Sequence, residues 1–379
     1  MAGAFPINDA VTAPEPALVW PPSFPASRDE VTASWVRETL QPHPRFRGDP
    51  IRDVELRDLG DGLGQLSALT LAELTCRSGR RQQLVIKLHA AVPEMHQVAL
   101  AYGHYQSEVR FYAEMAPGVP MRTPDIYVSA MDPACGRVVI VMEGFGAWHS
   151  PDQIVGANAD EVIIAVSALS GLAATYWNDP PIRQFPWLRS PDSPAYASLP
   201  RDYAACVPIL LDRFERDWPG GSARPLKQIA GSYARIQQAL LRRPQVVAHW
   251  DYRVENLFYG ADGEFAVIDW QLMRTDVPAN DLAYLLACNV SAGLRRDIEA
   301  DMMARFLAGL REQGVLDYQQ VDLELDYRLA LLSISAILVI GGANADIGNA
   351  RSRKLFSTIG ARLLAAIDDW QATDLIAAL

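Results

Sequence analysis

The chain has 379 residues, of which 50% are hydrophobic and 21% are charged. This length exceeds what one compact core usually holds, so two lobes are expected. The formal net charge is -11, and no basic run is longer than Arg80-Arg81 or Arg242-Arg243. A nucleic-acid-binding protein needs clustered cations, so no nucleic acid partner is expected. An acidic balance is common among cytosolic proteins and does not by itself indicate a cationic substrate.

The cysteines and the apolar segments argue against a zinc site, a disulfide framework and a membrane span. The four cysteines lie far apart, at Cys76, Cys135, Cys206 and Cys288. Residues 1–27 are predicted to form a flexible arm, because they lack the basic and apolar regions of a signal peptide. The longest apolar run, residues 330–342, is too short to span a bilayer comfortably and is predicted to be a buried helix. We therefore expect a cytoplasmic protein without a membrane partner.

After the arm, the pattern predicts a lobe built mainly from strands. Ser27 to Glu30 is typical of a helix start. Five strands are then predicted, over residues 51–59, 64–77, 81–89, 125–130 and 137–143. One helix is predicted among them, over residues 96–115, and stops before Pro117.

From Gly144 onwards the pattern is helical, apart from one hairpin over residues 256–269. Seven helices are predicted, over residues 160–176, 200–218, 226–242, 279–289, 295–313, 322–340 and 351–370. The expected fold class is therefore α+β, with a small mostly-β lobe over residues 28–143 and a large mostly-α lobe over residues 144–379.

The segment from His249 to Asn256 has the pattern H-x-D-x-x-x-x-N, and a hairpin then leads to an apolar strand that ends in Asp269. Phosphoryl transfer requires positioning and charge neutralisation more than covalent work by the protein. One aspartate must face the nucleophile, while an asparagine and a second aspartate bind Mg²⁺. Asp251, Asn256 and Asp269 fit these roles. Each residue alone is equally typical of caps and turns, but the ordered set is far more specific.

These motifs resemble the aminoglycoside-phosphotransferase and choline-kinase-like superfamily, and Asp251-Tyr252-Arg253 with Asp269-Trp270-Gln271 is closest to its bacterial small-molecule kinase and ecdysteroid-kinase-like branches. The resemblance implies a protein-kinase-like bilobal fold and ATP as the cofactor. It implies that Asp251 is the catalytic aspartate, that Asn256 and Asp269 bind Mg²⁺, and that His249 fixes the catalytic loop. Asp281, in the helix that follows, would be mainly structural.

Two residues upstream match further parts of this resemblance. Lys87 lies in an apolar strand, and the resemblance makes it the lysine that holds the α- and β-phosphates. The alternative is an edge-strand lysine that faces water. Glu108 lies on the next helix and would pair with Lys87; the alternative is a solvated glutamate.

The nucleotide is expected to contact two backbone segments of the first lobe. Gly62, Gly64 and Ser67 lie in a glycine-rich turn ahead of Lys87, where backbone N–H groups can approach phosphates. Glycine-rich turns often only turn, and this one is neither a Walker loop nor a dinucleotide fingerprint. Glu143 and Gly144 would form the hinge that binds adenine.

Two positions depart from the superfamily pattern. Trp250 stands where glycine is usual, and Ala173 stands where histidine is frequent. Six aromatic residues of the second lobe would suit an apolar or ring-containing acceptor or belong to the core: Trp148, Tyr176, Trp177, Phe185, Trp187 and Trp218. Arg253 and Arg274 flank the motifs and would face phosphate, face an anionic acceptor or form surface ion pairs.

The sequence thus predicts ATP- and Mg²⁺-dependent phosphorylation of a hydroxyl on a small molecule, by a monomer or a homodimer. One alternative is a nucleotide-binding pseudokinase with a regulatory role, although no key residue is missing. A protein kinase is less consistent, because Trp270-Gln271 follows Asp269 where Phe-Gly would be expected and no A-P-E segment follows.

Overall fold

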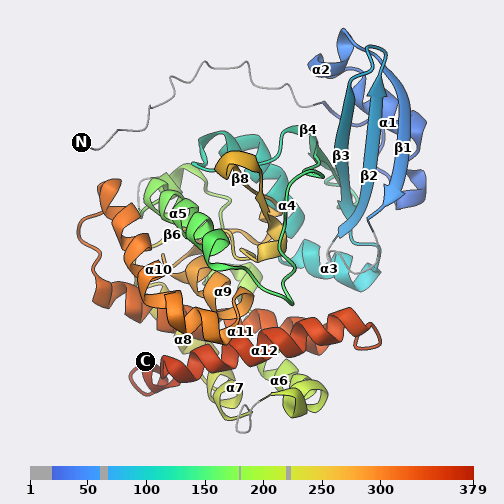
Figure 1. Ribbon diagram of the computed structural model, residues 1–379. Helices are drawn as coiled ribbons and strands as arrows, with labels where there is room; N and C mark the ends of the chain where they lie inside the picture. Colours follow the sequence, from blue (N-terminus) through green and yellow to red (C-terminus); the bar gives the residue numbers. More distant parts are fainter. Residues whose placement is uncertain (1–18, 60–66, 179–180, 219–222) are drawn as a thin grey trace, which may run out of the picture. The chain divides into compact units, whose positions relative to one another are not determined.

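The computed structural model describes residues 19–59, 67–178, 181–218 and 223–379 (Figure 1). The chain divides into two compact units. The first unit comprises residues 1–96 and 125–144, and the second comprises residues 97–124 and 145–379.

The first unit is built on a five-stranded antiparallel sheet in the order β1-β2-β3-β5-β4. The strands are β1 (Ile51–Asp58), β2 (Ser67–Cys76), β3 (Arg81–His89), β4 (Ile126–Met131) and β5 (Val138–Glu143). All five strands predicted from the sequence are present. Residues 60–66, which include the predicted phosphate turn, lie outside the described residues.

One face of this sheet is covered by two helices, α1 (Ala33–Leu40) and α2 (Pro44–Arg47). Alternate residues of β3 point into this core, and Leu84, Ile86 and Leu88 are almost fully buried. The predicted helix start at Ser27 to Glu30 is wrong for α1, because residues 28–30 form a 3₁₀ turn. The side chain of Thr32 caps α1 by accepting the backbone N–H of Trp35.

The helix predicted over residues 96–115 is interrupted. It consists of α3 (Pro93–Ala101), α4 (His104–Arg110) and a π-helical turn (Phe111–Met115). Gly103 separates the first two with a left-handed φ of 62°, which glycine adopts at little cost. A Cβ at Gly103 would overlap the guanidinium of Arg189, which donates hydrogen bonds to Gly103 O (3.1 Å) and Ser107 Oγ (2.6 Å). The absence of a side chain at Gly103 therefore leaves room for Arg189 to bind the start of α4.

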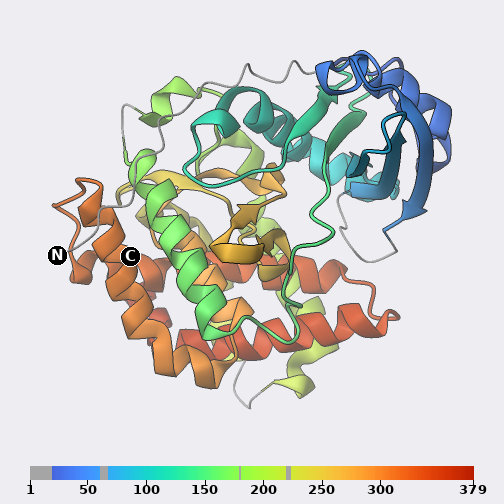
Figure 2. The ribbon, with the colours of Figure 1, turned by 45° about the horizontal axis from the view of Figure 1, so that its top comes forward.

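The second unit is mainly helical (Figure 2). Its longer helices are α5 (Ala159–Thr175), α6 (Leu199–Phe214), α7 (Ala223–Ala230), α8 (Tyr233–Leu240), α9 (Asn280–Asn289), α10 (Ala292–Glu312), α11 (Gln320–Asn344) and α12 (Ala350–Asp369). The prediction of a single helix over residues 226–242 is wrong, because two helices, α7 and α8, are separated by a turn there. α11 packs against α6, α9 and α12 and is largely buried, as predicted for its apolar run. Among the described residues, no helix has the length and apolarity that a membrane crossing requires.

Two small antiparallel sheets lie among these helices. The hairpin β7 (Leu257–Tyr259) and β8 (Phe265–Val267) confirms the hairpin predicted over residues 256–269. The pair β6 (Val246–Ala248) and β9 (Arg274–Asp276) was not predicted, since three-residue strands carry too little periodicity. These two sheets frame the segment from His249 to Asn256.

Candidate active site

The segment between β6 and β7, which the sequence predicts to be the catalytic loop, is held at its start by a carboxylate from α9. Asp281 accepts the backbone N–H of His249 (2.6 Å) and that of Trp250 (2.9 Å). Burial raises the pKa of Asp281 to about 7, although the two N–H groups act in the opposite direction. Asp281 is thus the anchor of the loop.

His249 fixes the loop from inside. Its Nδ1 lies 3.2 Å from the backbone N–H of Asp251, and its Nε2 lies 3.0 Å from Ile268 O. Because Nδ1 accepts a hydrogen bond, the ring is neutral and carries its proton on Nε2, which donates to the carbonyl. His249 thereby joins the catalytic loop to the end of β8, just before Asp269.

Asp251 is buried and has two unlike carboxylate oxygens. Oδ2 accepts from Asn256 Nδ2 (3.0 Å) and lies 3.3 Å from Arg253 Nε, whereas Oδ1 has a longer contact, 3.4 Å, with Tyr284 OH. Burial raises the pKa of Asp251 to about 6, Arg253 lowers it, and the charge of Asp269 raises it. A carboxylate in this range is ionised at neutral pH and still basic enough to accept a proton.

Asn256 and Asp269 present oxygen atoms that suit a hard cation. The Nδ2 group of Asn256 donates to Asp251 O and Oδ2, so its Oδ1 points away from those bonds. Asp269 follows β8 with a left-handed φ of 65°, a costly conformation for a residue with a Cβ. Within the described part of the chain, no group of three or more His, Cys, Asp or Glu residues could hold a metal. One amide oxygen and one carboxylate fit Mg²⁺, which usually completes its shell with phosphate and water.

Trp270 packs the segment after Asp269 against the α4 region. Its ring stacks on Phe111 with centroids 4.1 Å apart and meets the ring of His249 edge-on at 4.6 Å. Trp270 is fully buried. The residue that distinguishes this chain from a protein kinase therefore has a clear packing role.

Trp250 also has a left-handed backbone, with φ of 67°. Its Nε1 donates to Asp276 Oδ2 (2.8 Å), and the guanidinium of Arg274 lies 3.8 Å from its ring centroid. Arg274 is paired with Asp276 at 2.6 Å and is buried. The hypotheses that Arg274 faces an anion or forms a surface ion pair are therefore wrong: it completes a buried Trp–Arg–Asp cluster beside the loop.

The six aromatic residues considered for the acceptor do not form one wall. The ring of Phe185 lies between those of Tyr176 and Trp187 and contacts both. Trp177 contacts Tyr318 instead. Trp218 stacks on Phe214 in the core, and Trp148 packs on Phe145. The alternative that these rings contribute to core packing fits this separation best.

In the first unit, Lys87 lies on a central strand. β3 pairs with β2 and β5, and Lys87 stands between Leu69 and Ile140. Its side chain is buried, so the alternative of an edge-strand lysine facing water is wrong. Alternation places Val85 on the same face as Lys87, opposite the face that α1 covers.

The other predicted nucleotide residues lie as follows. Ser67 begins β2 opposite His89 and is buried, and within the described residues its Oγ has no hydrogen-bond partner. Glu143 ends β5 and accepts the backbone N–H of Asp125 through Oε2 (3.2 Å). Glu108 is buried on α4, in the second unit, and its pairing with Lys87 stays a prediction. Gly62 and Gly64 lie outside the described residues.

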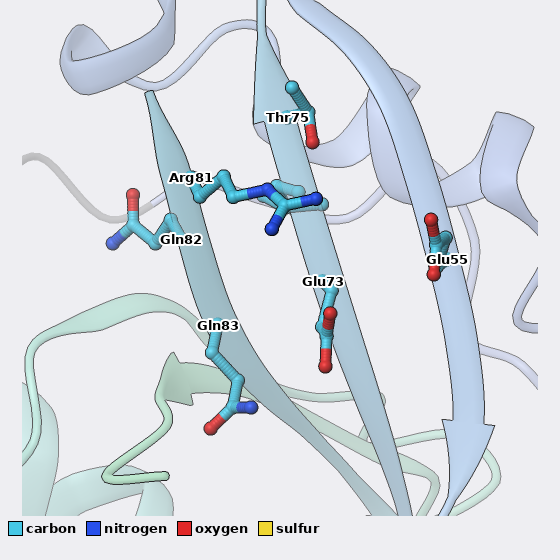
Figure 3. A pocket seen from close by; sticks show the side chains of 7 residues that line it. Glu55, Glu73, Thr75, Arg81, Gln82 and Gln83 are labelled. Atoms are coloured by element: carbon cyan, nitrogen blue, oxygen red, sulfur yellow. The ribbon is translucent and has the colours of Figure 1, made fainter. Parts of the chain in front are cut away.

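A hollow of about 240 Å³ opens on the face of the sheet that carries Lys87 (Figure 3). It lies near the start of β3, whereas Lys87 lies near the end of that strand. Glu55, Glu73 and Gln83 lie side by side across it on β1, β2 and β3. Gln83 is four residues from Lys87, roughly 13 Å along a strand. Arg81 also lines this hollow, but its one positive charge is outnumbered by the two carboxylates, so we do not assign the hollow to the nucleotide's phosphates.

The sequence did not indicate three residues of the site. Tyr284 contacts Asp251. Asp276 accepts from Trp250, and Glu255 pairs with Arg253. Glu255 lies inside the motif and its charge was a usable signal. The other two are ordinary residues of a helix and a short strand.

A five-stranded antiparallel sheet with a central lysine, and a helical unit that carries Asp251 and Asn256 on one loop and Asp269 after the following hairpin, define a protein-kinase-like fold. The family model described as "Phosphotransferase enzyme family" matches residues 39–323, about three quarters of the chain. The chain belongs to this phosphotransferase family.

Solved structures support the fold. A spectinomycin phosphotransferase in complex with ADP and spectinomycin is 13% identical, with a TM-score of 0.51 over 90% of this chain and 99% of that chain. A Plasmodium vivax ethanolamine kinase is 11% identical, with a TM-score of 0.50 over 84% of this chain and 83% of that chain. A comparison with curated proteins finds no match.

Proposed function

We propose that the chain transfers the γ-phosphate of ATP to a hydroxyl of a small molecule in a reaction that requires Mg²⁺. The observation that carries this proposal is the asymmetry of the Asp251 carboxylate. Oδ2 is occupied by Asn256 and Arg253, while Oδ1 has the long contact with Tyr284. Oδ1 is therefore the oxygen that accepts the proton of the incoming hydroxyl, and the fixed loop holds it in place.

The charges around Asp251 support the same chemistry. Asn256 Oδ1 and Asp269 would hold the Mg²⁺, which supplies charge neutralisation at the transferred phosphoryl group. Arg253 keeps Asp251 ionised, because its guanidinium lowers the pKa of that carboxyl. Asp251 is thus ready to accept a proton at neutral pH.

For the nucleotide, we assign the phosphates to Lys87 and to the glycine-rich turn that the sequence predicts at Gly62, Gly64 and Ser67. The half-buried apolar side chains beside Lys87 on β2 and β3, those of Leu69, Leu71 and Val85, would cover the adenine ring. The backbone carbonyls of Glu143 and Gly144 would contact its edge, because the N–H groups of these residues donate to Asp125 O (2.8 Å) and Gln83 O (3.0 Å). The ADP in the spectinomycin phosphotransferase structure supports an adenine nucleotide as the donor.

An acceptor panel tests the proposal. Amino alcohols, aminoglycosides and other hydroxyl compounds are incubated with Mg-ATP, and ADP release is followed with mass spectrometry of the products. We expect one class to be phosphorylated, and EDTA to stop the reaction. Asp251→Asn should lower kcat by about 10²–10⁴-fold, the usual contribution of general acid–base catalysis. Asp160→Asn is the control, because Asp160 is exposed on α5. Equal turnover of wild type and Asp251→Asn on an identified acceptor would refute the assignment.

A further inference from the structure

The helix α12 lies outside the residues that the family model matches, yet it contacts the catalytic loop. Arg351 stands in its first turn. Its Nη1 donates to Asp152 Oδ2 and its Nη2 donates to Glu255 Oε1, each at 2.6 Å. Glu255 belongs to the loop and lies four residues after Asp251. A residue of α12 therefore holds a carboxylate of the catalytic loop.

From Glu255 an unbroken series of opposite charges leads to Asp251. Glu255 Oε2 accepts from Arg253 Nη1 (2.7 Å), and Arg253 Nε lies 3.3 Å from Asp251 Oδ2. The side chain of Arg351 is 47% exposed, whereas those of Glu255 and Asp251 are 15% and 12% exposed. The series thus begins at the surface and ends at the buried catalytic carboxylate.

A second arginine of α12 fixes the neighbouring segment. Arg362 follows Arg351 by eleven residues, about three helical turns, so the two share a face. Its guanidinium donates to the carbonyls of Gln153 (2.7 Å), Ile154 (2.8 Å), Val155 (3.0 Å) and Cys288 (3.3 Å). The backbone N–H of Gln153 in turn points to Glu255 Oε1 at 3.4 Å. α12 therefore supports Glu255 by two routes.

We propose that Arg351 is a positioning residue for phosphoryl transfer. Arg351 holds Glu255, Glu255 orients Arg253, and Arg253 occupies Oδ2 of Asp251 so that Oδ1 faces the acceptor. This inference rests on the proposed role of Asp251. It adds a helix outside the family match to the parts that set the geometry of the site.

The charges explain why the effect should reach Asp251. In the described part of the chain, the ion pairs of Glu255 are those with Arg253 and Arg351. Without Arg351, the carboxylate of Glu255 attracts Arg253 alone, and the guanidinium shifts away from Asp251. Arg351 is half-exposed, and ion pairs of this kind contribute little to folding stability. The loss should therefore be seen in the loop rather than in global unfolding.

The test compares Arg351→Gln with Arg353→Gln. Arg353 lies on the same helix and pairs at 3.9 Å with Asp217, away from the loop. Hydrogen–deuterium exchange of peptides from residues 246–259 is measured in the full chain without substrate. Arg351→Gln should speed exchange there and Arg353→Gln should not. With the acceptor from the panel, kcat of Arg351→Gln should fall about threefold to tenfold with KM for ATP nearly unchanged, as for couplings through packed networks.

Two further variants strengthen the test. Arg351→Lys should restore only part of kcat, because one ammonium cannot span Asp152 and Glu255 as the guanidinium fork does. Adding Arg351→Gln to Glu255→Gln should produce no further loss, since both cut the same series. If the two Gln variants of α12 show equal exchange and kcat, or if Arg351→Gln and Glu255→Gln act additively, the proposal is wrong. Exchange needs no reaction, so it tests the coupling even if Asp251 proves not to be catalytic.

Discussion

Trp250, whose backbone is left-handed, offers a sharp test of how the predicted catalytic loop is stabilised, because Trp250→Phe and Trp250→Gly remove different interactions. Phenylalanine keeps an aromatic ring over Arg274 but loses the N–H that bonds to Asp276. Glycine removes the ring as well and relieves the left-handed backbone, whose φ is 67°.

The contacts set the expected magnitudes. A buried hydrogen bond to a charged group contributes about 1.5–3 kcal/mol. Asp276 keeps Arg274 at 2.6 Å and the backbone N–H of Val277 at 2.8 Å, so we expect Trp250→Phe to cost roughly 2 kcal/mol, near the lower end. Truncation of a buried Trp costs about 3–5 kcal/mol, and relief of the backbone returns roughly 1 kcal/mol. Trp250→Gly should therefore lower the free energy of unfolding by about 2–4 kcal/mol. Its urea concentration at half-unfolding should lie below that of Trp250→Phe.

Urea unfolding followed by far-UV circular dichroism measures these differences, with the slope of each transition checked against wild type. The expected order of stability is wild type, then Trp250→Phe, then Trp250→Gly. A glycine variant as stable as wild type would show that relief of the backbone strain offsets the whole loss of the ring contacts. A phenylalanine variant as stable as wild type would show that the bond to Asp276 contributes nothing.

Two other positions give independent predictions. Burial raises the pKa of Asp281 to about 7 in the folded chain, against roughly 3.9 when unfolded, so its contribution to stability is complete below about pH 4 and is lost as pH rises through 7. Asp281→Asn should flatten this part of the curve of unfolding free energy against pH, and an unchanged slope would contradict the reasoning. Gly103→Ala should destabilise the chain by about 1–3 kcal/mol, because the new Cβ overlaps Arg189 and φ is 62°. Gly48→Ala is its control in thermal unfolding, since no atom lies within 4 Å of the added carbon.

The strands of the first unit could be predicted because their pattern is local. Leu84, Ile86 and Leu88 of β3 are buried in the same core as residues of α1, so the period of two is visible in the sequence. Lys87 interrupts that apolar strand, and its burial on a central strand agrees with the functional interpretation. The order of Asp251, Asn256 and Asp269 was equally visible, because the motif has fixed spacing.

The features that could not be predicted depend on contacts between distant residues. In the sequence, Gly103 is indistinguishable from any other glycine within a helix. The structure shows that the Arg189 guanidinium occupies the space beside it. The β6–β9 pair brings Arg274 and Asp276 to Trp250, and nothing in three residues of sequence indicates that partnership.

The same distinction explains how one short motif obtains its geometry. Within the loop, Asn256 contacts Asp251 across five residues, and this spacing predicts the chemistry. The loop is held from outside by Asp281, whose contact spans 32 residues, and by Arg351, whose contact with Glu255 spans 96 residues. Substitutions at such supports change the position of the catalytic carboxylate without changing the motif. Differences in rate between chains that share this motif should therefore be sought in α9 and α12 as well as in the loop itself.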